Sequence, residues 1–163
     1  MKRRIMLQII ALFAIFIVTL VLEIAPWPAD LQSLKPSWLI LALMYWTLFT
    51  PNKINIGVAF LLGIIWDLVL GSVLGIHALV LSIFAYAIAS NHLILRNLSL
   101  WLQSLLVIIF VILIRCGIFI IELLIHNSMI FHWQEVFGAI FSGLLWPWVF
   151  FLFHKIQQRL QLQ

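Results

Sequence analysis

The segment Gly63-Ile-Ile-Trp-Asp-Leu-Val-Leu-Gly-Ser-Val-Leu-Gly75 holds one carboxylate, Asp67, inside an otherwise apolar run. Two glycines, four residues apart, follow this acid. A helix that is apolar on every side is surrounded by apolar material, and glycines at its end favour a turn. The segment therefore predicts a buried helix that ends in a turn, with an acid just before the turn and a second helix after it.

The rest of the chain is equally apolar. Of its 163 residues, 66% are hydrophobic and 9% are charged, and the mean hydropathy is +1.23. Soluble domains carry about 25% charged residues, and a soluble fold of this size could not bury so much apolar surface. We therefore expect an all-α integral membrane protein in which residues 1–163 form a single polytopic domain. This length leaves no room for a soluble catalytic domain.

Charged residues, prolines, glycines and asparagines divide the chain into candidate membrane helices. A membrane span needs about 20 apolar residues. Six candidates cover residues 5–25, 36–49, 54–70, 74–90, 98–125 and 133–154. The second and third are shorter than a full span, so we expect tilt or local thinning of the bilayer there. No small-residue cleavage site follows the basic start of the chain, so the first apolar run is expected to stay as a helix.

The basic residues predict the orientation, because they are more frequent in cytoplasmic loops. With the N-terminus in the cytoplasm, the inner side holds Lys2, Arg3, Arg4, Lys53, Arg96, Lys155 and Arg159. The outer side then holds only Lys35. We expect a multi-pass inner-membrane protein with both termini in the cytoplasm. The net charge of +4 is spread along the chain, so nucleic acid is not an expected partner.

Asp67 has three interpretations. It can accept hydrogen bonds from the free N–H groups at the start of the next helix, which is a structural role. It can help to dock a partner's membrane helix, or it can belong to a proton or substrate site. Gly71 and Gly75 likewise have two interpretations. Their spacing fits a helix-packing motif, which would favour a homodimer, but it also fits the turn between two helices.

Arg115 and Glu122 lie seven residues apart and share one face of the fifth helix. A deep arginine needs a carboxylate or carbonyl partner, and Asp67 lies at a compatible depth. One hypothesis is that Asp67 faces Arg115, so that neutralising both would be less harmful than neutralising either. In the alternative, Arg115 snorkels toward the membrane surface or binds carbonyl oxygens.

The sixth helix contains Trp146, Pro147 and Trp148. They indicate either a kinked helix that packs two large rings or part of a groove for a partner. Nothing in the sequence predicts an enzyme or a cofactor: there is no phosphate loop, no metal-ligand spacing and no pairing of a nucleophile with a base. The single cysteine, Cys116, excludes an intrachain disulfide.

Several segments in order along the chain resemble the rod shape-determining MreD family of Gram-negative bacteria. They are Ile24-Ala-Pro-Trp-Pro-Ala-Asp-Leu31, Lys35-Pro-Ser-Trp-Leu39, the quoted segment from Gly63 to Gly75, Arg96-Asn-Leu-Ser-Leu-Trp101 and Leu145-Trp-Pro-Trp148. The resemblance implies a non-catalytic component of the cell-elongation machinery, which scaffolds peptidoglycan synthesis. The implied partners are MreC, the filament protein MreB, the glycosyltransferase RodA, its transpeptidase and membrane lipids.

The resemblance also implies a fold similar to the substrate-binding subunits of energy-coupling-factor transporters. The rival interpretation is therefore a small-molecule transporter or substrate-binding subunit. Six helices and a buried acid favour this rival, but no inverted repeat or matched pair of broken helices is visible.

Overall fold

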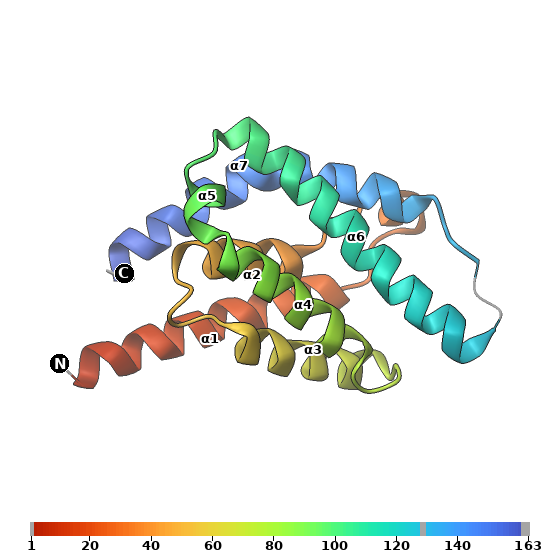
Figure 1. Ribbon diagram of the computed structural model, residues 1–163, viewed down its shortest axis with the longest axis horizontal. Coiled ribbons are helices and arrows are strands. Elements are labelled where there is room, and N and C mark those ends of the chain that lie inside the picture. The colour runs from red at the N-terminus through yellow and green to blue at the C-terminus, as the bar shows by residue number, and fades with distance from the viewer. Residues whose placement is uncertain (1, 128–129, 161–163) are drawn as a thin grey trace.

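The computed structural model describes residues 2–127 and 130–160, and within these ranges it is helical and contains no strand (Figure 1). The elements are α1 (Lys2–Ile24), the 3₁₀ helix η1 (Ala29–Leu34), α2 (Trp38–Phe49), α3 (Ile56–Leu70), α4 (Ile76–Ser90), α5 (His92–Arg96), α6 (Leu100–His126) and α7 (Gln134–Leu160). The six longer helices of the described residues match the six that the sequence predicts. The predicted link between the last two includes residues 128 and 129, which lie outside the described residues.

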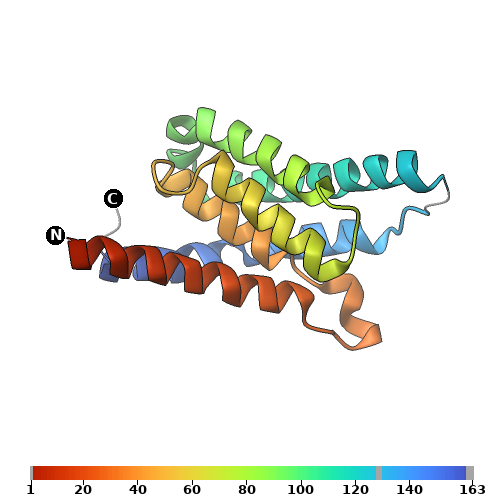
Figure 2. The same ribbon diagram turned by 90° about the horizontal axis from the view of Figure 1, so that it is seen from below.

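The long helices run back and forth, so the ends of the molecule collect different segments (Figures 1 and 2). The two termini, the α2–α3 turn and α5 lie at one end. η1, the α3–α4 turn and the start of α7 lie at the other. This up-and-down path is the one expected of a protein that crosses a membrane repeatedly.

The helix α2 forms the centre of the core. Every residue from Leu39 to Leu48 in it is buried, as expected of a helix that is apolar all round. It contacts α1, α4, α5 and α7. The sequence placed its start at Pro36, but Ser37 is the N-cap and Trp38 is the first helical residue. The tertiary amide of Pro36 disfavours helical backbone at the preceding residue, which separates η1 from α2.

Three helices of the described chain are long and apolar enough to cross a membrane: Arg3–Ile24, Leu100–His126 and Gln134–Leu160. α3 and α4 have 15 residues each, which gives a length of about 22 Å at 1.5 Å per residue. This is less than the ~30 Å of the hydrocarbon core. The chain is therefore an all-α membrane protein in which the long helices α1, α6 and α7 pack with the shorter helices α2, α3 and α4.

The helices α3 and α4 form the closest antiparallel pair in the fold. Gly63 makes this approach possible, because a Cβ atom at this position would overlap the backbone of Ala78 on α4. Gly117 differs, since a Cβ atom there would lie 3.6 Å from Val80, an ordinary contact. The close pairing of α3 and α4 fixes the turn that follows Asp67.

Candidate functional site

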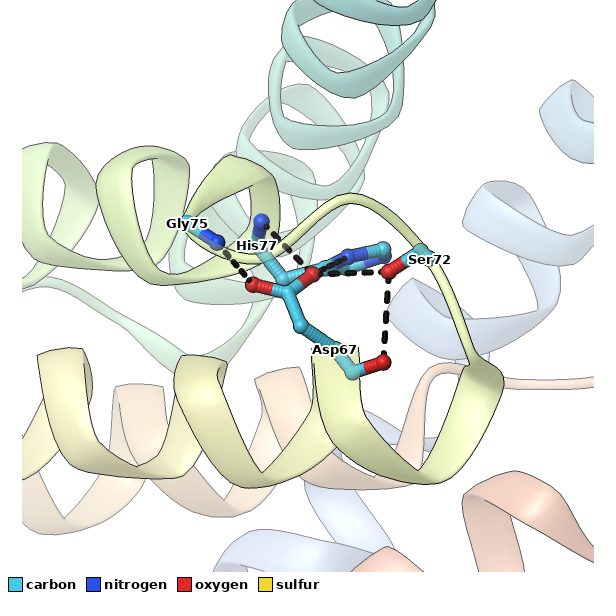
Figure 3. A network of polar contacts seen from close by, with 4 residues as sticks. All are labelled: Asp67, Ser72, Gly75 and His77. Atoms are coloured by element: carbon cyan, nitrogen blue, oxygen red, sulfur yellow. Dashed lines mark hydrogen bonds and ion pairs between the residues drawn. The ribbon is translucent and has the colours of Figure 1, made fainter.

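Asp67 lies in the last turn of α3, and its carboxylate is fully buried. One oxygen, Oδ2, accepts a hydrogen bond from the backbone N–H of Gly75 at 2.8 Å. The other, Oδ1, accepts from the hydroxyl of Ser72 at 2.9 Å and from the backbone N–H of His77 at 3.3 Å (Figure 3). The carboxylate therefore satisfies donors at the start of α4, as its structural interpretation predicts.

The imidazole of His77 completes this network. Its Nδ1 lies 2.6 Å from Oδ1 of Asp67. Among residues 2–127 and 130–160, this is the only contact within 4.0 Å between a basic nitrogen and a carboxylate oxygen. An ionised carboxylate only accepts hydrogen bonds, so Nδ1 of His77 carries the proton that is shared with Asp67. The ring of Trp66 covers the imidazole, with ring centroids 4.5 Å apart. The network thus joins the end of α3 to the first turn of α4.

Gly71 and Gly75 form the ends of the turn between these helices. Their φ angles are +67° and +104°, in the region that glycine adopts without strain. The N–H of Gly71 donates to the carbonyl oxygen of Asp67, which closes α3 with a left-handed cap. The turn interpretation of these two glycines is therefore confirmed. They do not form a helix-packing stripe, because such a stripe requires both glycines on one continuous helix.

Arg115 lies midway along α6 and joins three elements. Its Nη1 donates to the carbonyl oxygen of Glu135 at 2.6 Å, and its Nη2 donates to the hydroxyl of Ser37 at 2.7 Å. Gly138 makes room for the guanidinium, since a Cβ atom there would lie 2.7 Å from Nη1. Asp67 bonds elsewhere, so the pair that the sequence suggested between Asp67 and Arg115 is not formed. The arginine instead binds a carbonyl oxygen, as the alternative interpretation of Arg115 predicts, and a hydroxyl.

A cavity of about 880 Å³ with several charged residues in its lining lies between the end of α1, the starts of α2 and α7, and the helices α3, α4 and α6. Its lining includes Arg115 and Glu122, the two charged residues that the sequence placed on one face of α6. His77 and Ser72 from the Asp67 network also line it. The cavity therefore borders on both of the polar networks described above.

Sequence reasoning missed several lining residues. Glu23 lies at the end of α1, Lys35 precedes α2, and Glu135 lies in the first turn of α7. Each looked like an ordinary residue at a membrane surface, because the sequence does not show that these three helix ends meet. The one available signal was Lys35, the single basic residue predicted for the outer side.

The three residues around Pro147 have different environments. The ring of Trp146 is fully buried, and its Nε1 donates to the side-chain oxygen of Gln103 on α6 at 3.2 Å. The ring of Trp148 is 78% exposed. α7 continues through Pro147, although proline cannot donate to the carbonyl oxygen of Gly143. The interpretation that both rings pack inside is wrong, because residues two apart on a helix point to different faces.

The described helices, the buried acid and the glycine turn agree with the resemblance noted in the sequence. The family model of the rod shape-determining protein MreD matches residues 3–156. The chain belongs to the MreD family. The rod shape-determining protein MreD of Haemophilus influenzae is 56% identical to this MreD-family chain over 162 residues, which cover 99% of each protein. No solved structure matches the chain.

Membership of the MreD family gives the chain a role in cell shape. The MreD match runs from the first turn of α1 to near the end of α7. It therefore includes the Asp67 network, the residues around Arg115 and the paired tryptophans of α7. All three features therefore lie within the part of the chain that the MreD family model matches.

Proposed function

We propose that this chain is a non-catalytic component of the bacterial inner membrane that scaffolds cell elongation by binding MreC. Through MreC it would connect the MreB filament with RodA and the elongation transpeptidase. Family membership supports the cell-shape role, and the high share of helix among residues 2–127 and 130–160 supports contact within the bilayer. Recognition there depends on the packing of side chains between helices.

The outward face of α7 is the surface that best fits a partner helix. Large exposed side chains recur along it every three or four residues: Phe137, Ile140, Leu144, Trp148 and Phe151. This spacing forms one continuous stripe on a helix. Trp148 is the largest and most exposed of these side chains, and aromatic residues of this kind dominate interface energies. This stripe is the observation on which the binding of a single-span partner rests.

The inward face of α7 supports the stripe from behind. Trp146 is anchored to Gln103 by its hydrogen bond, and Gly143 lets α7 approach Ile108 of α6 more closely than any larger residue would. A fixed helix loses little freedom when a partner binds, which favours affinity. We therefore assign to Trp146 a supporting role and to Trp148 direct contact with the partner.

The cytoplasmic surface would be the end that holds the two termini, the α2–α3 turn and α5. Lys53 lies in that turn and Arg96 ends α5. Basic residues at this end can contact anionic lipid or an acidic filament surface. A homodimer would need a surface other than Gly71 and Gly75, because these residues belong to the α3–α4 turn.

Depletion of the chain in a rod-shaped host tests this function. We expect the cells to become round, and we expect a tagged copy to restore the rods and to co-purify with MreC. A Trp148→Ala copy should be present at the normal level in the membrane but recover less MreC. Rod-shaped growth after complete depletion would contradict the proposal, as would full recovery of MreC by the Trp148 variant.

A further inference from the structure

We propose that the cavity with charged residues in its lining binds a zwitterionic group, with its anion at the guanidinium of Arg115 and its ammonium at the carboxylate of Glu23. The cavity lies where α1 ends and α7 begins, since its lining includes Glu23, Gln134 and Glu135. Its volume of about 880 Å³ falls in the range of ~300–1,000 Å³ that is typical of small-ligand sites. This inference concerns the isolated chain and does not depend on the binding of MreC.

Arg115 supplies the anion site. Within the described part of the chain, no carboxylate oxygen lies within 4.0 Å of its guanidinium, which is bonded to one carbonyl oxygen and one hydroxyl. A guanidinium has five N–H donors, two of which bond to Glu135 and Ser37, and Arg115 lines the cavity. Arg115 is half-buried, and a cation at this depth without a contacting anion is costly inside a membrane. Phosphate or carboxylate would compensate this charge with bidentate hydrogen bonds.

Glu23 supplies the complementary charge. Its Oε2 accepts a hydrogen bond from the backbone N–H of Leu39 at 3.3 Å. The ammonium of Lys35 binds the carbonyl oxygens of Glu23 and Ala25, the latter at 3.2 Å, and not the carboxylate. Arg115 interacts electrostatically with Glu135 and with Glu23, and Glu23 interacts with Arg115 and Lys35, but no carboxylate oxygen among them lies within 4.0 Å of a basic nitrogen. Two opposite charges thus face one cavity, each without a contacting counter-ion among the described residues.

The balance of charge favours a zwitterion over a simple anion. Two basic residues, Lys35 and Arg115, line the cavity together with three acidic ones, Glu23, Glu122 and Glu135. An anion alone would meet this acidic excess, and a cation alone would meet Arg115. A ligand with both charges would pair with each. His77 adds a further polar atom, because Nδ1 is committed to Asp67 and the other ring nitrogen, Nε2, is left for the cavity that His77 lines.

The required chemistry is an ammonium joined to a phosphate or carboxylate. An aminophospholipid head group provides it from the membrane, and a soluble zwitterion such as phosphoethanolamine provides it from the aqueous phase. To distinguish these sources, the full chain is purified in detergent and incubated with each of three probes. The probes are phosphatidylethanolamine, phosphatidylglycerol with the same acyl chains, and free phosphoethanolamine, and bound probe is counted by native mass spectrometry.

The variants Arg115→Gln and Glu23→Gln each remove one of the proposed contacts. Asp30→Asn is the matched control for Glu23→Gln, since its side chain is exposed and does not line the cavity. Because Arg115 also joins three helices, a cavity-narrowing variant, Ile118→Phe, tests occupancy without removing a polar group. Circular dichroism and size-exclusion chromatography establish that each variant is folded before its binding is compared.

We expect wild type to retain phosphatidylethanolamine at least tenfold better than phosphatidylglycerol. Glu23→Gln and Ile118→Phe should each lose this preference, whereas the control Asp30→Asn should keep it. If free phosphoethanolamine binds as well as the lipid and shows the same losses, the zwitterion site stands and its source is soluble. Equal retention of the two lipids by wild type with no binding of phosphoethanolamine would overturn the proposal, as would unchanged retention in folded Glu23→Gln and Ile118→Phe.

Discussion

Asp67 shows how a charged group can be kept inside an apolar bundle. Its four hydrogen bonds come from Ser72, Gly75 and His77, all within ten residues along the chain. A buried carboxylate is tolerated when its oxygens are satisfied in this way. The acid therefore fixes the path of the α3–α4 turn, and any role in partner binding would be exerted through that geometry.

Replacing Asp67 with Asn should destabilise the isolated chain. An amide offers one acceptor oxygen, and its NH₂ group would face donors that now bind the carboxylate. We expect a loss of about 3 kcal/mol in the free energy of unfolding. Thermal unfolding in detergent measures it, with Asp30→Asn as the exposed control. Equal stability of the two variants would show that the network contributes nothing.

A double-mutant cycle separates the two polar networks. Since Asp67 and Arg115 have no shared hydrogen-bond partner, the effects of Asp67→Asn and Arg115→Gln on the free energy of unfolding should add to within about 0.5 kcal/mol. Unfolding of the single and double variants in one detergent provides the comparison. If the double variant loses much less unfolding free energy than the sum of the two single losses, the result would support the direct Asp67–Arg115 pair that the sequence suggested.

At the scale of the elements, the sequence predicts the long helices well, because charges and prolines mark their ends. The glycine turn was one of two interpretations that the sequence allowed for Gly71 and Gly75, and their positive φ angles decide between them. The sequence does not predict η1 or α5, which are single short turns inside polar connections. The close packing of α3 on α4 was also missed, because Gly63 lies in an apolar run that gives no sign of what faces it.

The α3–α4 contact can be tested with two glycines. Gly63→Ala would force the α3 backbone away from Ala78, and we expect it to cost about 1–3 kcal/mol of folding free energy. Gly117→Ala places its methyl at an ordinary distance from Val80 and should be neutral or slightly stabilising. Unfolding curves of both variants give the comparison. Similar losses in the two would mean that the tight approach is not required.

At the scale of the whole molecule, the cavity is the feature that sequence reasoning could not reach. Its lining brings together charges from the end of α1, the segment before α2, the middle of α6 and the start of α7. These residues are far apart in the chain, and Glu23, Lys35 and Glu135 each resemble a surface charge. The overall path of the chain was easier to predict, because alternating turns and dispersed basic residues indicate which ends lie together.

This path predicts which loops face each side of the membrane. In a variant lacking Cys116, a cysteine at Ala29 in η1 should react with an impermeant maleimide added to cells whose outer membrane is permeabilised. A cysteine at Asn52 in the α2–α3 turn should react only after the inner membrane is opened. The reverse pattern would invert the proposed orientation of the chain.

Site-specific photocrosslinking in living cells tests the proposed scaffold role most directly. A photoreactive residue at position 148, on the outward stripe of α7, should crosslink to MreC. One at position 68, on the exposed face of α3, should crosslink to lipid alone, although Leu68 is 62% exposed. Crosslinking to MreC from position 68 with none from position 148, in cells that keep their rod shape, would contradict the assignment of α7 as the partner-binding surface.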